Sequence, residues 1–289
     1  EVRTEESCLV HITLHWYHFH QFCSKIYQYN NPLGCYMEKN HYITPLEQTI
    51  LEIAPERGPI LIENMLMALD HVSDQVVRNA FSSLVEKGRL YRMQRGIYLR
   101  CERPHMPIID DPARLALAIY PGYLAFFSAL HHWGLHEYEP FTVTVATENR
   151  SAERGIGQYT IRVVAMGRRA QGMVFDEGVY VSTLDKTIFD CIYKPNLSGG
   201  YNLVVRAISD CEPDWGEVRF WLDELGTQSL RQRAGYILSR AGNAPDWLLD
   251  HLKEEKLENI WLDPSGTRRG TRVGEWGIID NARVRDAYG

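Results

Sequence analysis

The sequence predicts an α+β protein, with an N-terminal winged helix-turn-helix followed by a larger mixed α/β C-terminal domain. Residues 45–100 show three helical apolar patterns and then two alternating stretches, which is the element order of a winged helix. Farther along, strands are followed by a run of helices, as is typical of an α+β domain. The length of 289 residues leaves room for two domains.

The composition excludes several classes of protein. Hydrophobic residues make up 45% and charged residues 24% of the chain, so wholesale disorder is excluded. No run approaches the roughly 20 apolar residues of a membrane-spanning helix. The net charge of −6 excludes a protein that binds nucleic acid through charge alone. Six cysteines without a CxxC pair predict reduced thiols and a cytoplasmic protein.

Residues 1–36 differ from the rest of the chain, because they hold four histidines and three cysteines and show no helical period. The candidate zinc ligands there are His15, His18, His20 and Cys23. No second, distant pair of ligands completes a site, so we expect no metal. We expect natural translation to start at Met37 and the preceding residues to be a leader from outside the native coding sequence. A genuine N-terminal extension is the alternative.

Residues 37–104 are the expected winged helix, and its first two helices have clear boundary signals. Thr44 is a good N-cap with Pro45 at the first helical position, and Gly58-Pro59 ends the helix. Its expected apolar face is Leu46, Ile50, Leu51 and Ile53. A second short helix is predicted over Ile60–Leu69, and its expected inward residues are Ile62, Leu66 and Leu69.

A third helix is predicted from a Ser73 cap to Lys87, where Gly88 stops it. Its expected buried stripe is Val76, Val77, Ala80, Phe81, Leu84 and Val85. Residues 89–93 and 96–100 then alternate like the two strands of a hairpin. The other face of the third helix carries side chains suited to base edges and phosphates, namely Asp74, Gln75, Arg78, Asn79 and Ser82.

Positive charge gathers in the same segment. Residues 78–103 hold seven basic and two acidic residues, a net charge of +5. We therefore predict that the third helix and the hairpin bind duplex DNA. The predicted contact residues are Gln75, Arg78, Asn79, Ser82, Lys87, Arg89, Arg92, Gln94 and Arg95. The opposing interpretation is a solvated helix or a winged helix used for protein contacts, and Asp74 would repel phosphate.

Residues 105–289 are the expected C-terminal domain, entered through a Pro-rich junction at 104–112. The predicted helices are 113–120, 124–133, 183–193, 199–211, 217–225, 229–241 and 245–257. The predicted strands are 141–147, 159–165, 178–182, 261–262 and 276–279. This region holds 20 basic and 25 acidic residues, which makes it a poor principal DNA binder. A local exception is the basic loop with Arg268, Arg269 and Arg272, interpreted as a solvated loop with a nucleic-acid or partner contact as the alternative.

Catalytic motifs are missing from the sequence. It contains neither GxxxxGK[ST] nor GxSxG, so we expect no enzyme activity and no cofactor. His131 and His132 diverge by about 100° on a helix and cannot readily share a metal, so we expect one to be packed and the other exposed. Asp185 and Asp190 could be paired carboxylates, but Asp185 near a helix start is better explained as stabilising exposed N–H groups.

The chain resembles the AbiEi family, the antitoxins of AbiE-type (type IV) toxin–antitoxin systems, also described as regulators of viral defence. The matching pieces run from about residue 45 to 281. They are LVEKGRLYRMQRGIYLR, YLAFFSALHHWGL, FTVTVAT, VSTLDKTIFDCIYKPNLSGG, RQRAGYILSR and LDPSGTRRGTRVGEWGIIDN. The resemblance implies a winged helix that represses its own promoter, usually at inverted repeats. It also implies a C-terminal domain that counteracts a nucleotidyltransferase-like toxin, typically without a stable complex.

Two other classes compete with the antitoxin. One is a winged-helix regulator whose C-terminal domain senses a ligand and has no toxin partner. The other is a nucleotidyltransferase or nuclease with a DNA-guiding domain, which the lack of a Gly-Ser followed by a DxD pair disfavours. Rescue from a toxin separates the first two classes, whereas promoter binding does not.

Overall fold

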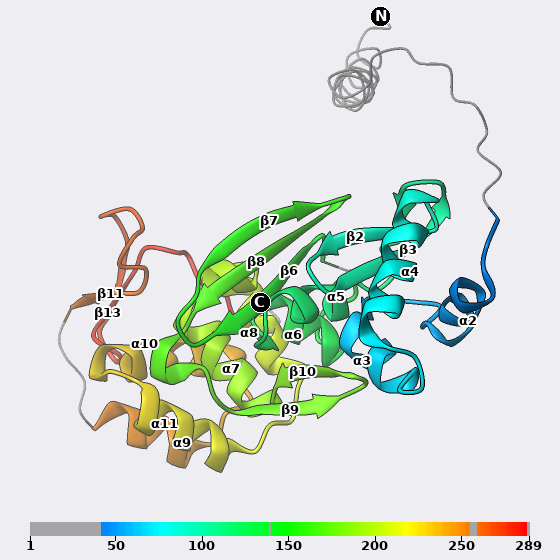
Figure 1. Ribbon diagram of the computed structural model, residues 1–289. Coiled ribbons are helices and arrows are strands. Elements are labelled where there is room, and N and C mark those ends of the chain that lie inside the picture. Colours follow the sequence, from blue (N-terminus) through cyan, green and yellow to red (C-terminus); the bar gives the residue numbers. More distant parts are fainter. Residues whose placement is uncertain (1–41, 139, 255–258, 288–289) are drawn as a thin grey trace, which may run out of the picture. The chain divides into compact units, whose positions relative to one another are not determined.

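The computed structural model describes residues 42–138, 140–254 and 259–287, and it is a mixed α+β structure with several sheets (Figure 1). The leader predictions, including the candidate zinc ligands and the start at Met37, lie outside these residues. In the described part of the chain, no helix combines the length and the apolar character needed to span a bilayer.

The N-terminal elements follow the predicted order of helices and hairpin. The elements are α2 (Pro45–Ile53), β1 (Ile60–Leu61), α3 (Ile62–Ala68), α4 (Asp74–Glu86), β2 (Leu90–Gln94), β3 (Ile97–Arg103) and β4 (Met106–Pro107). The strands form one sheet in the order β1-β3-β2, with β4 paired to β3. Arg95 and Gly96 make the hairpin turn, and Gly96 adopts a positive φ of 81° that favours glycine there.

Three predictions in this segment are wrong. Ile60 and Leu61 form a strand, because they pair antiparallel with Tyr98 and Ile97 across the sheet. Ile53 and Val76 are 46% and 47% exposed, because each lies at the margin of its helix's buried stripe. Ser73 occupies the N-cap position of α4 but makes no side-chain capping hydrogen bond.

A six-stranded sheet in the order β7-β8-β6-β5-β10-β9 organises the next part of the chain. Its strands are β5 (Tyr123–Leu124), β6 (Thr142–Thr147), β7 (Ala152–Ile156), β8 (Tyr159–Ala165), β9 (Met173–Asp176) and β10 (Val179–Ser182). Pairs β6–β8 and β5–β10 are parallel, and the others are antiparallel. Helix α5 (Pro112–Ile119) packs on the face that carries Val143 and Val145. Helices α6 (Phe127–His132) and α7 (Leu184–Tyr193) also adjoin this sheet.

Four helices and a small sheet complete the described fold. They are α8 (Tyr201–Ser209), α9 (Trp215–Leu225), α10 (Gln228–Ala241), α11 (Asp246–Lys253), β11 (Ile260–Trp261), β12 (Thr271–Val273) and β13 (Ile278–Asp280). The strand order is β11-β13-β12. The predicted helix over 124–133 starts late, because Tyr123 and Leu124 pair with Ala146 and Val145 as a strand. Strands β4, β7, β9 and β12 lie where no strand is predicted from the sequence.

The hairpin shares a hydrophobic core with the six-stranded sheet. Ile97 and Leu99 belong to the same buried cluster as Leu115 of α5 and Val145 of β6. Between them, Tyr98 packs on Phe81 of α4 with ring centroids 4.8 Å apart. Strand β3 is therefore covered on both faces, and residues 45–289 form one compact unit without a break in the core at residue 104.

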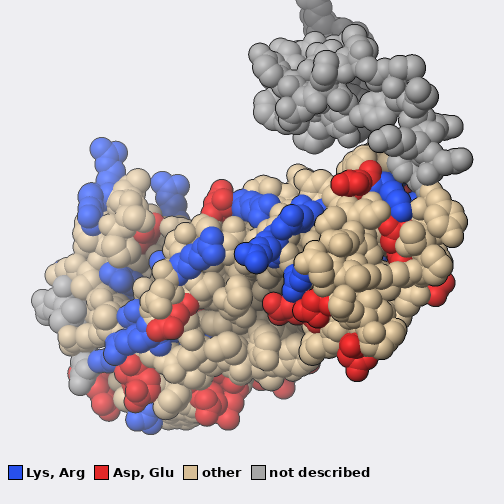
Figure 2. Space-filling model, in the orientation of Figure 1, with Lys and Arg blue, Asp and Glu red and all other residues tan. Residues whose placement is uncertain are grey.

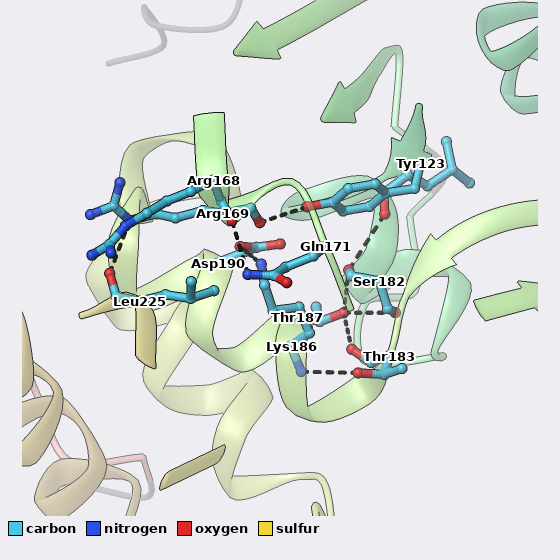
Figure 3. Close-up of polar contacts among 11 residues, drawn as sticks. Tyr123, Arg168, Arg169, Gln171, Ser182, Thr183, Lys186, Thr187, Asp190 and Leu225 are labelled. Carbon is cyan, nitrogen blue, oxygen red and sulfur yellow. Dashed lines mark hydrogen bonds and ion pairs between the residues drawn. The ribbon is translucent and has the colours of Figure 1, made fainter. Parts of the chain in front are cut away.

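Lys186 and Asp190 lie one helical turn apart on α7 and form a buried ion pair. The ammonium of Lys186 donates to Asp190, and both side chains are fully buried. Burial raises the pKa of Asp190 to about 6 and lowers the pKa of Lys186, and the attraction between the two charges opposes both shifts. Figure 3 shows this pair beside Ser182 and Thr187, whose hydroxyls are 2.7 Å apart.

We predict that the cost of breaking this pair comes from the charge left behind. Asp190→Asn should lower the free energy of unfolding by about 3–5 kcal/mol, because the Lys186 ammonium then lacks a counter-charge in the core. The double variant Lys186→Met/Asp190→Asn keeps both side-chain volumes nearly constant, removes both charges and should be more stable than Asp190→Asn alone. Urea denaturation of the three proteins provides the measurement. Equal losses in the single and double variants would contradict this account.

Candidate nucleic-acid interface

Helix α4 presents one polar, exposed face. Its buried side chains are Val77, Ala80, Phe81 and Leu84, which pack inward at helical spacing. On the opposite side Asp74, Gln75, Arg78, Asn79 and Ser82 are all exposed, as expected from the sequence. Because the helix is anchored along its whole apolar stripe, these side chains extend from a fixed backbone, which is what base readout requires.

The polar groups on α4 are hydrogen-bonded to one another along the helix. Gln75 Nε2 donates to Asn79 Oδ1 at 2.8 Å, and Ser82 Oγ donates to the Arg78 carbonyl at 3.1 Å. The two carboxamides retain further donor and acceptor capacity. Amides of this kind pair with adenine N6 and N7, and an arginine pairs with guanine O6 and N7. The face therefore has the chemistry for direct readout.

The hairpin is held at its tip from two sides. Ile62 N donates to the Gly96 carbonyl at 2.9 Å, and Arg154 Nη2 of β7 donates to the Met93 carbonyl at 3.2 Å. Arg92 and Arg95 are exposed on this hairpin, whereas Gln94 is half-buried where the pairing with Ile97 shifts register. The two arginines thus extend from a fixed strand and turn.

Lys87 differs from its predicted role. Its ammonium lies 2.7 and 2.6 Å from the two carboxylate oxygens of Glu47, whose side chain is 2% exposed. Arg100 is also engaged internally, because its guanidinium donates to carbonyls at the end of α2, including Ala54 at 2.7 Å. We therefore expect Lys87 to stabilise the fold rather than contact DNA. The remaining basic side chains of the segment are exposed: Arg78, Arg89, Arg92, Arg95 and Arg103.

The other candidates from the sequence have structural partners. His132 Nε2 lies 2.8 Å from Asp176 Oδ2, and His131 Nδ1 lies 3.1 Å from the His136 carbonyl. Both histidines are half-buried, so the prediction of one packed and one exposed is wrong. Across the described ranges, no group of three or more potential ligands could hold a metal ion.

Asp185 and Asp190 each have a structural partner of their own. Asp185 Oδ1 accepts from the backbone N–H of Asp214 at 2.8 Å, ahead of α9, and Thr183 caps α7 instead. Asp190 is committed to Lys186 in the core. Asp185 also lies in the first turn of α7 and accepts from its own backbone N–H, so its expected role of stabilising exposed N–H groups near a helix start is confirmed.

No family model and no curated protein sequence matches this chain. Among solved structures, the chain is similar to the RV2827C protein from Mycobacterium tuberculosis, with a TM-score of 0.57 and 16% sequence identity. The match covers 82% of this chain and 90% of that protein. The similarity establishes a shared fold.

We predict that Lys87 supports stability rather than DNA binding. Lys87→Ala removes the ammonium that lies against the buried Glu47 carboxylate, which should cost about 3–5 kcal/mol of unfolding free energy. Arg89→Ala, two residues along and exposed, is the matched control and should unfold like the wild type. Denaturant titrations compare them directly. The assignment fails if Lys87→Ala keeps wild-type stability and loses affinity for DNA.

Proposed function

We propose that residues 45–103 form a winged helix-turn-helix that binds duplex DNA, with α4 in the major groove and the β2–β3 hairpin on the backbone or in the minor groove. The observation that carries the proposal is the exposed polar face of α4, with Gln75, Arg78 and Asn79 on a helix fixed by its buried stripe. The five exposed arginines of the segment supply the attraction to phosphate.

We further propose that the chain is an antitoxin that represses its own promoter and counteracts a nucleotidyltransferase-like toxin. The support for this part is the resemblance to the AbiEi family, whose matching pieces continue through residues 105–281. The same proposal includes an operator with inverted repeats. It also includes control of the toxin without a stable antitoxin–toxin complex.

A ligand-sensing regulator is the second candidate, and one cavity favours it. This cavity has a volume of about 540 Å³ and includes Arg114, Ser128, His132 and Glu177 in its lining. It also includes Asp110, whose carboxylate accepts from the backbone N–H of Gly58 at 3.0 Å, between α2 and β1. A ligand that moved Asp110 would therefore act on the loop next to the DNA-binding elements.

We predict that α4 reads bases. Arg78→Ala and Asn79→Ala should each weaken binding to the operator by about 1–3 kcal/mol and weaken binding to random duplex much less, because base-edge contacts exist only on the correct sequence. Fluorescence anisotropy with both duplexes measures the two affinities.

The matched control is Arg92→Ala/Arg95→Ala in the hairpin. Phosphate or minor-groove contacts should lower affinity for both duplexes and reduce the salt dependence by about one unit per residue. If the α4 variants lose equal affinity on both duplexes, α4 contacts only the backbone and the base-reading role is wrong.

We also predict that neutralisation of the toxin survives loss of operator binding. The full-length Arg78→Ala protein, expressed from an independent promoter together with the proposed nucleotidyltransferase-like toxin, should restore growth like the wild type. The independent promoter is needed because lost repression would otherwise raise the toxin level. Absence of rescue by the wild type would favour the ligand-sensing regulator, and rescue by the wild type alone would tie antitoxicity to DNA binding.

A further inference from the structure

The end of the loop between β11 and β12 and the start of β12 display three arginines on a continuous exposed stretch. Residues 267–272 are all exposed, and they include Arg268, Arg269 and Arg272. We call residues 265–272 the arginine loop. Figure 2 shows blue side chains projecting at the upper left of the view, where Figure 1 draws the orange segment next to β11 and β13. This is a local basic site within the part of the chain that is acidic overall.

The backbone of the arginine loop is held in place by its neighbours. Asn281 Nδ2 donates to the carbonyls of Asp263 and Thr267, at 2.8 Å each. A Cβ atom at Gly270 would lie 2.5 Å from the Asp280 carbonyl oxygen, so only glycine lets the loop approach β13 this closely. The loop is therefore anchored at both ends, and its arginines extend from a fixed backbone.

Among the described residues 259–287, the carboxylates of Asp263, Glu275 and Asp280 are engaged with other partners. Asp263 Oδ1 accepts from the backbone and hydroxyl of Ser265, and Glu275 pairs with Lys253 at 2.8 Å. Asp280 is buried and accepts from Tyr236 and from backbone N–H groups of residues 282–284. Within the described ranges, none of the three arginines forms an ion pair. Arg268 lies over the Trp261 ring, 5.4 Å from its centroid.

The composition of the loop favours a phosphate-rich partner over a protein. Residues 265–272 contain serine, glycine, threonine and arginine and no apolar side chain. Protein interfaces are built around an apolar or aromatic centre, which is missing from this stretch. Guanidinium groups match the geometry of phosphate, and small polar neighbours let a phosphate backbone come close.

We propose that the arginine loop binds the phosphodiester backbone of a nucleic acid, as a second contact separate from α4. The site requires no base readout, so its affinity depends on salt and not on sequence. The proposal holds whether or not α4 binds DNA. Its ligand is either duplex DNA or single-stranded RNA, which share the same backbone chemistry.

The test uses the full chain and the variant Arg268→Ala/Arg269→Ala/Arg272→Ala. Binding to a random duplex DNA and to a single-stranded RNA with the same number of phosphates is measured over a range of salt concentrations. For the nucleic acid that the loop binds, the steepness of the plot of log K against log salt should decrease in the variant. The expected decrease is about 0.9 per lost contact for duplex DNA or about 0.7 for single-stranded RNA. If the salt dependence changes with only one of the two probes, that probe identifies the nucleic acid, duplex DNA or single-stranded RNA, that the loop binds.

The matched control is Arg168→Ala/Arg206→Ala/Arg219→Ala, which removes the same charge from three exposed sites elsewhere. It should leave the slope unchanged. Thermal unfolding checks that both triple variants fold, and a triple lysine variant of the loop, which keeps the charge, should retain the slope. Operator binding by Arg78→Ala is measured in parallel. Because Arg78 lies on α4 and not in the arginine loop, this result tests the α4 proposal separately from the loop proposal.

Three outcomes would overturn the proposal. The first is wild-type affinity and slope for the loop variant on both probes. The second is an equal loss in the control variant, which would reduce the effect to net charge. The third is unchanged nucleic-acid binding together with lost rescue from the toxin, which would assign the loop to a protein partner.

Discussion

The rest of the described structure depends on the burial of strand β3 on both of its faces. Three consecutive residues of β3 point alternately to two different cores, with Tyr98 against α4 and with Ile97 and Leu99 against α5 and the six-stranded sheet. Side chains of a strand alternate between its faces, so this arrangement requires that all three be buried. The DNA-contacting elements that we propose are consequently packed on the remainder of the chain rather than joined to it by a free linker.

Whether a charged side chain can contact a partner molecule depends on its burial as much as on its position in the sequence. Lys87 and Lys186 each pair with a buried carboxylate, and Arg100 satisfies backbone carbonyls at the end of a helix. While they keep these interactions, the charged groups of Lys87, Lys186 and Arg100 are not available to bind a partner molecule. The arginines of α4, the hairpin and the arginine loop remain at the surface. The total charge of −6 therefore says little about what any one surface attracts.

Local periodicity predicted the elements that pack along their own length. Helix α4 and strands β6 and β8 have regular apolar spacing, and the structure confirms all three, together with the exposure of the α4 polar face. Strands β1 and β5 have two residues each and are defined only by their partners across the sheet. Strand β7, with the sequence AERGI, likewise has no alternating pattern and exists because it pairs with β8.

The same limit applies at the candidate site. Glu47, the partner of Lys87, lies 40 positions earlier in the sequence, beyond any local pattern. Glu47 is spaced at helical period with Ile50 and Ala54, which are also buried. An acid in such a series of buried positions favours a cation close to it. The register shift at Gln94 had no comparable signal.

The anchoring of the hairpin tip has a consequence for the nucleic acid itself. Ile62 N and Arg154 Nη2 donate to the carbonyls of Gly96 and Met93, and these two hydrogen bonds restrain the turn from moving to meet a groove of a different width. If α4 docks as proposed, the duplex must supply the adjustment by bending or by narrowing its minor groove. Flexible pyrimidine–purine steps and stiff A-tracts differ in the energy of such a change. Part of the operator's preference would then reside in base pairs that the protein does not touch.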